Sequence, residues 1–175
     1  MPNWTSSTVR VEGEAADLEV FIAHLRGPEE IFDFNKIIPM PEILIHTASG
    51  HCTINGQDVT SWYVIDPQQA MFGGDDNIRL FTPEEEAALA AIGHRDWYSW
   101  RIENWGTKWN ACHTQFVEGS PDHGYIDIRF DTAWDAPMPI FYRLLELFPQ
   151  LGFAFSWQHE DSDLWYSVER DREAA

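Results

Sequence analysis

The order of strand-like and helix-like segments along the chain constrains its fold most. Residues 5–12 alternate loosely between polar and apolar side chains, which predicts a strand. Residues 15–26 then repeat apolar side chains three and four positions apart, which predicts a helix that Gly27-Pro28 ends. The amino-terminal region therefore reads as strand followed by helix.

The last third of the chain is more regular. Residues 112–119 and 124–131 form two strand-like runs joined by a short loop. A helix follows, for which Asp135 can serve as the N-cap, and residues 153–160 and 164–170 are expected to form a final pair of strands. The order strand, helix, strand, strand, helix, strand, with one further strand, predicts an α+β fold of the ferredoxin-like type: an antiparallel sheet with two packed helices.

A long α/β insertion interrupts this order after the first helix. We expect a single domain over 1–175, with its core at 1–27 and 112–170 and the insertion at 28–111, because 175 residues suit one ordinary domain. We expect the insertion to begin with an extended connection at 32–42, followed by short strands at 43–47, 53–65 and 77–81, with a turn at Asn55-Gly56 and a flexible loop at 73–76. Two helices come next. The first begins with the capping box of Thr82, Pro83 and Glu85, and the second lies at 95–105.

The chain is strongly acidic, with a formal net charge of −18 from 29 acidic and 11 basic residues. Such a charge repels nucleic acid phosphates and anionic membranes, so direct binding to either is not expected. The acids are spread along the chain, which indicates a solvated surface or, in a sharper interpretation, a surface that imitates nucleic acid for a basic partner. The least acidic segment, 96–130, contains the motif NWGTKWN.

The sequence predicts a cytoplasmic location. Cys52 and Cys112 lie far apart and form no CxxC pair, so neither a zinc ribbon nor a disulfide framework is indicated. The first ten residues show no secretory signal, and no apolar run is long enough for a membrane span.

The motif NWGTKWN at 104–110 has two interpretations. In the structural one, Gly106 caps a helix with a positive φ, and a strand starting near Lys108 places Lys108 and Asn110 opposite Trp109. In the functional one, polar and aromatic side chains form a cup for a nucleotide or a phosphate. The candidate ligand-binding residues of that cup are Asn104, Trp105, Lys108, Trp109 and Asn110.

Signals for catalysis, metals and cofactors are weak. The sequence contains no GxSxG, P-loop, GxGxxG or HExxH motif, so no catalytic residue and no cofactor are assigned, and a non-enzymatic role is favoured. Cys112, His113 and His123 match no metal-ligand spacing, so no metal site is assigned. Four candidate sheet aromatics could suit RNA, but their surroundings are acidic: Phe116, Tyr125, Trp157 and Tyr166.

Several blocks of the sequence resemble the YubB-like family of plasmid and phage proteins. They are MPNW at 1–4, FNKIIPMPE at 34–42, NWGTKWNA at 104–111, and FDTAWDAPMPIF at 130–141 followed by LFPQLGF. The resemblance implies a ferredoxin-like domain and a mobile-element origin, and it implies no chemistry. This chain has Thr5 where the family usually carries cysteine, and Asp135, Ala136 and Pro137 where serine and two prolines are frequent.

These observations predict an accessory protein of a phage or plasmid. It would bind a host or competitor protein with a basic surface through its own acidic, aromatic-bearing surface, in the extreme as a nucleic-acid mimic that inhibits a defence protein. The alternative is a small-ligand binding protein or enzyme that uses the cup of Asn104, Lys108 and Asn110.

Overall fold

The computed structural model describes residues 3–54, 56–65 and 78–172. The chain divides into two compact units, one made of Met1–Pro39 and Glu103–Ala175 and the other of Met40–Ile102. The second unit lies inside the predicted insertion of 28–111 and is shorter than it. The predicted loop at 73–76 and Asn55 of the predicted turn lie outside the described residues.

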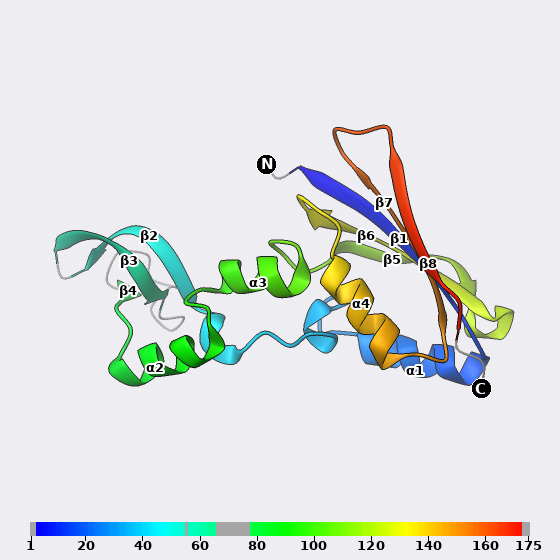
Figure 1. The fold of residues 1–175 in the computed structure, drawn as a ribbon, viewed down its shortest axis with the longest axis horizontal. Helices are drawn as coiled ribbons and strands as arrows, with labels where there is room; N and C mark the ends of the chain where they lie inside the picture. The colour runs from blue at the N-terminus through cyan, green and yellow to red at the C-terminus, as the bar shows by residue number, and fades with distance from the viewer. Residues whose placement is uncertain (1–2, 55, 66–77, 173–175) are drawn as a thin grey trace. The chain divides into compact units, whose positions relative to one another are not determined.

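The first unit is built on a five-stranded sheet with the strand order β5-β6-β1-β7-β8 (Figure 1). Every neighbouring pair of its strands is antiparallel. The strands are β1 (Trp4–Glu12), β5 (Cys112–Ser120), β6 (Tyr125–Ala133), β7 (Gly152–His159) and β8 (Trp165–Arg170).

Two helices, α1 (Ala15–Leu25) and α4 (Met138–Leu147), cover the same face of this sheet (Figure 1). Alternation along β1 turns Val9 and Val11 toward that face, where both are buried. Aromatic rings join the two layers: the Phe21 ring of α1 lies 5.8 Å from Phe153 of β7, and the Phe141 ring of α4 lies 6.3 Å from the same ring. The core of the first unit therefore lies between the sheet and these helices.

The second unit contains a three-stranded antiparallel sheet in the order β2-β3-β4, and the helix α2. The elements are β2 (Thr47–Ile54), β3 (Gln57–Ile65), β4 (Ile78–Arg79), α2 (Pro83–Ile92) and α3 (Trp97–Trp105), the last of which carries the chain back into the first unit. The predicted capping box is confirmed: the Thr82 hydroxyl accepts from the Glu85 N–H, and the Glu85 carboxylate accepts from the Thr82 N–H.

The coarse prediction of an α+β fold with antiparallel strands is confirmed. On β6, Ile126, Ile128 and Phe130 are buried and Arg129 is exposed, but Asp127 on the same side as Arg129 is also buried, where it accepts from Arg10. Within the described ranges, no helix combines the length and the apolar character that crossing a bilayer requires.

The predictions for residues 43–47 and for Asp135 are wrong. Residues 43–47 do not form a strand, because the backbone turns in a 3-10 helix at Glu42–Leu44 and β2 begins only at Thr47, whose hydroxyl donates to the Leu44 carbonyl. Asp135 does not cap α4, whose N-cap is Pro137; the Asp135 carboxylate instead accepts from the N–H of its neighbour Ala136. In both places a polar side chain makes a short-range hydrogen bond to the backbone that differs from the predicted local structure.

Candidate functional site

Three tryptophans from separate segments gather at one end of the five-stranded sheet. Trp4 begins β1, Trp109 lies in the turn before β5, and Trp134 follows β6. The ring centroids of Trp4 and Trp109 are 6.0 Å apart. The main-chain N–H of Trp134 donates to the carbonyl of Asn3, the residue before Trp4. Three of the sequence blocks that carry the family resemblance thus share one place in the fold. We call Trp4, Lys108, Trp109, His113 and Trp134 the tryptophan corner.

Lys108 links two of these rings. Its Nζ atom lies 5.3 Å from the ring centroid of Trp109 and 5.2 Å from that of Trp134. An ammonium group at such distances from an indole is attracted by the ring quadrupole, by about 0.5–1 kcal/mol at an exposed site. The lysine therefore contacts both half-exposed indoles and brings positive charge to the corner.

His113 also lies against the Trp4 ring. Its ring centroid is 5.5 Å from the Trp4 ring, and its Nδ1 atom is 2.9 Å from Oδ2 of Asp131. The other oxygen of Asp131 accepts a hydrogen bond from the Ser6 hydroxyl at 2.8 Å. The Ser6 hydroxyl thus donates to the Asp131 carboxylate and not to His113. The three residues therefore do not form a catalytic triad, in which the nucleophile donates to a base that an acid orients.

Backbone strain is concentrated at this corner. Among the described residues other than glycine, only His113 and Trp134 have positive φ, at 54° and 79°. This region of φ is unfavourable for a bulky side chain, at a cost of about 1–2 kcal/mol, and such outliers cluster at functional sites. The Trp134 side chain held in this way is 42% exposed. Trp134 thus combines an unfavourable backbone conformation with a partly exposed indole.

Trp105, a predicted site residue, has a structural position. It is fully buried, and its indole N–H donates to the carbonyl of Ile38 at 2.9 Å. Gly106 follows with φ of 78°, which confirms the predicted positive-φ glycine after the helix. The next residue, Thr107, is buried and donates from its hydroxyl to the Ala133 carbonyl.

Asn110 also uses its side chain within the protein. Its amide oxygen accepts from the N–H groups of Phe34 and Ala111, and its amide nitrogen donates to the Asp33 carboxylate. The amide therefore joins the turn before β5 to the segment that follows α1.

No strand starts near Lys108: β5 begins at Cys112, as the strand-like run at 112–119 predicts, so the strand alternation considered for Lys108, Trp109 and Asn110 is wrong. The positive φ of Gly106 opens an irregular turn, and Asn110 fixes this turn by hydrogen bonds, so strand alternation does not set the side-chain directions there. Asn104 is half-buried in the last turn of α3. Of the five predicted residues, the structure brings Lys108 and Trp109 together in the tryptophan corner.

The corner contains two aromatic residues that the motif analysis did not single out, Trp4 and Trp134. Both lie in sequence blocks that resemble the YubB-like family, and this shared resemblance is the signal that could have identified them. Their proximity depends on the register between β1 and β6, which pairs Trp4 with Ala133. Sequence reasoning did not supply that register.

The β7–β8 hairpin is fastened to the same end of the sheet. Glu160 accepts from the Trp4 N–H with its carboxylate and donates its own N–H to the Trp4 carbonyl, both at 2.8 Å. Beyond Glu160 the hairpin exposes a short apolar run, with Leu164 65%, Trp165 55% and Tyr166 43% exposed. The exposed acids Asp161 and Asp163 lie in the same turn. We call residues 160–166 the acidic-aromatic hairpin tip.

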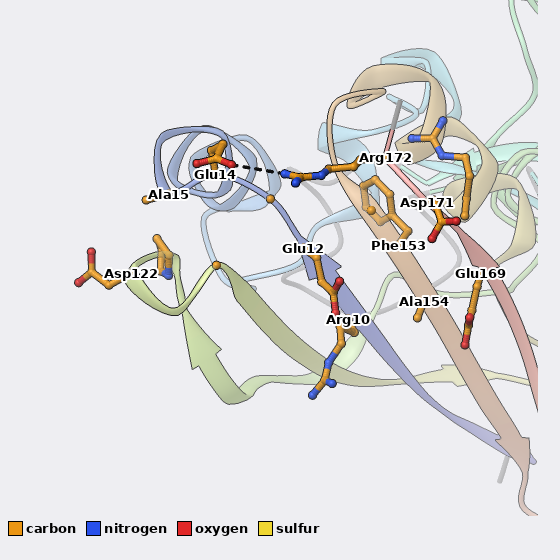
Figure 2. A pocket seen from close by; sticks show the side chains of 15 residues that line it. Arg10, Glu12, Glu14, Ala15, Asp122, Phe153, Ala154, Glu169, Asp171 and Arg172 are labelled. Carbon is orange, nitrogen blue, oxygen red and sulfur yellow. Dashed lines mark hydrogen bonds and ion pairs between the residues drawn. The ribbon is translucent and has the colours of Figure 1, made fainter. Parts of the chain in front are cut away.

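A cavity of about 940 Å³ lies at the other end of the sheet (Figure 2). Three of its lining residues are arginines, but each already has an acceptor. Arg10 forms a two-pronged ion pair with Asp127, and Arg172 faces Glu14 at 3.4 Å. The guanidinium of Arg170 donates to three carbonyls at the end of α4 and just beyond it, those of Leu145, Phe148 and Leu151. The arginines therefore serve the fold, and the cavity presents no ready anion site.

The four aromatics considered for RNA do not share one face of the sheet. Tyr125 lies on the side away from the helices, where its ring stacks under Arg10 at 4.7 Å. Trp157 pairs with Ser7 on the helix-covered side and stacks on Tyr166 at 5.7 Å. An RNA-binding sheet needs its stacking rings on one open face, which this arrangement does not provide.

Metal and thiol chemistry find little support in the described part of the chain. No group of three or more histidine, cysteine or acidic side chains there could hold a metal ion. Burial raises the pKa of the Cys112 thiol, and the nearby carboxylates of Glu30 and Asp131 raise it further. A thiol with a raised pKa is less nucleophilic at neutral pH, so Cys112 does not have the properties of a reactive cysteine.

Comparison with known proteins identifies a structural relationship. No family model matches the chain, and no curated protein matches it. Among solved structures, the crystal structure of a protein api92 from Yersinia pseudotuberculosis, with the family description DUF1281, is similar at a TM-score of 0.54 and 9% identity. The match covers 98% of this chain and 95% of that one. At this identity the likeness concerns the α+β fold alone.

Proposed function

We propose that the protein is a non-enzymatic accessory protein of a phage or plasmid that binds a basic host or competitor protein through an acidic, aromatic-bearing surface. The observation that carries this proposal is the acidic-aromatic hairpin tip, where exposed Trp165 follows exposed Asp161 and Asp163 along the chain. Exposed aromatic side chains are over-represented at protein interfaces, and a net charge of −18 favours encounter with a cationic partner. Its most specific form is a nucleic-acid mimic that occupies a DNA-binding or defence protein.

We also propose that the first unit has the ferredoxin-like topology and that the chain is related to the YubB-like family. The strand order β5-β6-β1-β7, with α1 following β1 and α4 between β6 and β7, supports the first point. The meeting of three resembling blocks at the tryptophan corner supports the second. Both cysteines are free, which fits the reducing cytoplasm in which we expect the protein to act.

Binding experiments test the proposed function. The full chain is immobilised, and proteins retained from a host extract are identified after washes between about 50 and 500 mM salt, a range that screens surface charge strongly. We expect basic partners that are lost as salt rises and that nucleic acid displaces. A double variant with L164S and W165S should no longer retain these basic partners. Recovery of only neutral or acidic partners, insensitive to salt, would contradict the proposal.

A matched control uses exposed apolar residues elsewhere on the first unit. Val20 on α1 is 60% exposed and Tyr142 on α4 is 55% exposed, close to the values for Leu164 and Trp165. A variant with V20S and Y142S should retain the same partners. Equal losses in the two variants would show that general surface polarity, and not the hairpin, controls binding.

A second candidate function is the binding of a nucleotide or phosphate at the tryptophan corner. The observation in its favour is Lys108 between two indoles, one of them on the strained backbone of Trp134. A base could stack on an indole while the lysine pairs with phosphate. A thermal-shift screen with nucleotides tests this: stabilisation that Lys108→Ala abolishes and V20S preserves would favour it.

A further inference from the structure

The two edges of the five-stranded sheet differ in their regularity. At one edge, β5 pairs with β6 with register shifts between Cys112 and Gln115 and between Phe116 and Glu118. At the other edge, β8 pairs with β7 in unbroken register along its whole length. Bulges bend an edge and interrupt the row of backbone groups that an added strand needs. The β8 edge is thus regular, and no described strand pairs with its outer side.

The side chains of β8 divide between the two faces of the sheet. Tyr166 pairs with Trp157 and stacks on it, so it lies on the helix-covered side with Val168 and with Arg170, which pairs with Phe153. Trp165, Ser167 and Glu169 lie on the side away from the helices. A strand added beside β8 would therefore meet aromatic and aliphatic groups on one face, and an indole, a hydroxyl and a carboxylate on the other.

The charges around the β8 edge indicate which kind of added strand it could bind. Asp161, Asp163 and Glu169 are exposed, whereas the guanidinium of Arg170 is directed to backbone carbonyls at the end of α4. Arg172, the next arginine along the chain, faces Glu14. Arginine or lysine on an incoming strand could stack on Trp165 and pair with Glu169, since both lie on the same face.

We propose that β8 takes up an extended segment of the partner protein as an additional strand, and that this segment alternates basic and apolar residues. Main-chain hydrogen bonds would supply affinity, and the alternating side chains would supply specificity. This inference rests on the proposed protein-binding function and adds to it the mode of docking and the pattern of the recognised segment.

A peptide experiment on the full chain tests the inference. The probe is a short synthetic peptide that alternates arginine and valine, compared with one that alternates glutamate and valine and with one in which the same arginines and valines form two blocks. Backbone NMR shifts and amide exchange locate the site. We expect only the alternating basic peptide to bind, with protection of β8 amides, and W165S to weaken its Kd by about tenfold or more.

The matched control is V117S on the bulged β5 edge, where Val117 is 47% exposed against 55% for Trp165. It should change the Kd by less than about twofold. Absence of peptide binding at millimolar concentration, or protection at β5 instead of β8, would overturn the inference. If the protection of β8 amides from exchange increases with protein concentration in the absence of peptide, the edge binds a second copy of the chain. This result would also overturn the inference.

The outcomes separate this inference from the proposed function. If salt-sensitive basic partners are recovered with the intact hairpin tip but β8 amides stay unprotected in their presence, the protein-binding function holds and strand addition fails. If no such partners are recovered, the proposed function itself fails.

Discussion

The side-chain amide nitrogen of Asn110 donates to the carboxylate of Asp33 at 2.7 Å, which joins two segments 77 positions apart. Asp33 is 7% exposed, and the oxygen of the same amide accepts from the Phe34 N–H. One asparagine thus satisfies a donor and an acceptor from the segment after α1. The NWGTKWN turn therefore holds the first unit together at this point.

Replacing Asn110 should destabilise the first unit. Asn110→Ala leaves the Phe34 N–H and the Asp33 carboxylate each without one partner, which costs about 1–3 kcal/mol. Asn110→Asp should cost more, because it places a second carboxylate against a nearly buried one. Urea unfolding followed by tryptophan fluorescence measures both. An exposed control such as Gln115→Ala should change stability by less than about 0.5 kcal/mol. Unchanged stability in Asn110→Asp would contradict the structural role.

Gly106 should resist substitution for two separable reasons. Its φ is 78°, and an added Cβ would lie 2.9 Å from Cδ of Pro139 and 3.3 Å from the Ala136 carbonyl oxygen. Gly93 has a similar φ of 83° with no heavy atom within 4 Å of such a Cβ. Gly93→Ala should therefore show backbone strain alone, about 1 kcal/mol, and Gly106→Ala should exceed it. Equal losses of unfolding free energy would show that crowding at Gly106 is unimportant.

Acid should loosen the start of α2. The two-pronged hydrogen bond from Arg79 lowers the pKa of Glu85 to about 2, and the bond from the Thr82 N–H lowers it as well. A carboxylate with a depressed folded-state pKa contributes stability that is present above its ordinary pKa near 4.5. That contribution is lost as the pH falls toward 2.

An NMR titration of the Glu85 side chain checks this prediction. The midpoint should lie near 2 in the native chain and rise in Arg79→Gln, which removes the principal cause of the shift. A midpoint that stays unchanged in Arg79→Gln would exclude the ion pair as that cause.

Local chemistry made part of this structure predictable. Thr82 and Glu85 define a helix start within four residues, and Gly106 marks a helix end, so short-range signals were enough for both. The tryptophan corner was beyond such reasoning, because it depends on the pairing of β1 with β6 and on a tryptophan in an unfavourable backbone region. Propensity predicts neither long-range register nor a strained residue that tertiary contacts hold in place.

The strain at Trp134 predicts an opposition between stability and function. Trp134→Asn places in the same backbone region a residue that adopts positive φ more readily, which should recover about 1 kcal/mol. The lost contact with the Lys108 ammonium and the lost packing of the covered part of the indole offset this gain, so the free energy of unfolding should fall by no more than about 2 kcal/mol. If the indole serves binding, this variant should remain folded and lose any ligand or partner that the tryptophan corner holds.

Two comparisons make this last prediction decisive. Lys108→Met removes the charge while retaining an apolar side chain, and it should reduce binding of an anionic ligand while Trp134 remains exposed. Trp134→Phe keeps an aromatic ring and the backbone strain, and it should retain part of the binding. Thermal unfolding and ligand-induced shifts in Tm measure both properties on the same samples. A Trp134→Asn variant that loses several kcal/mol of stability would instead assign the strained indole a role in folding, and the tryptophan corner would then be part of the architecture.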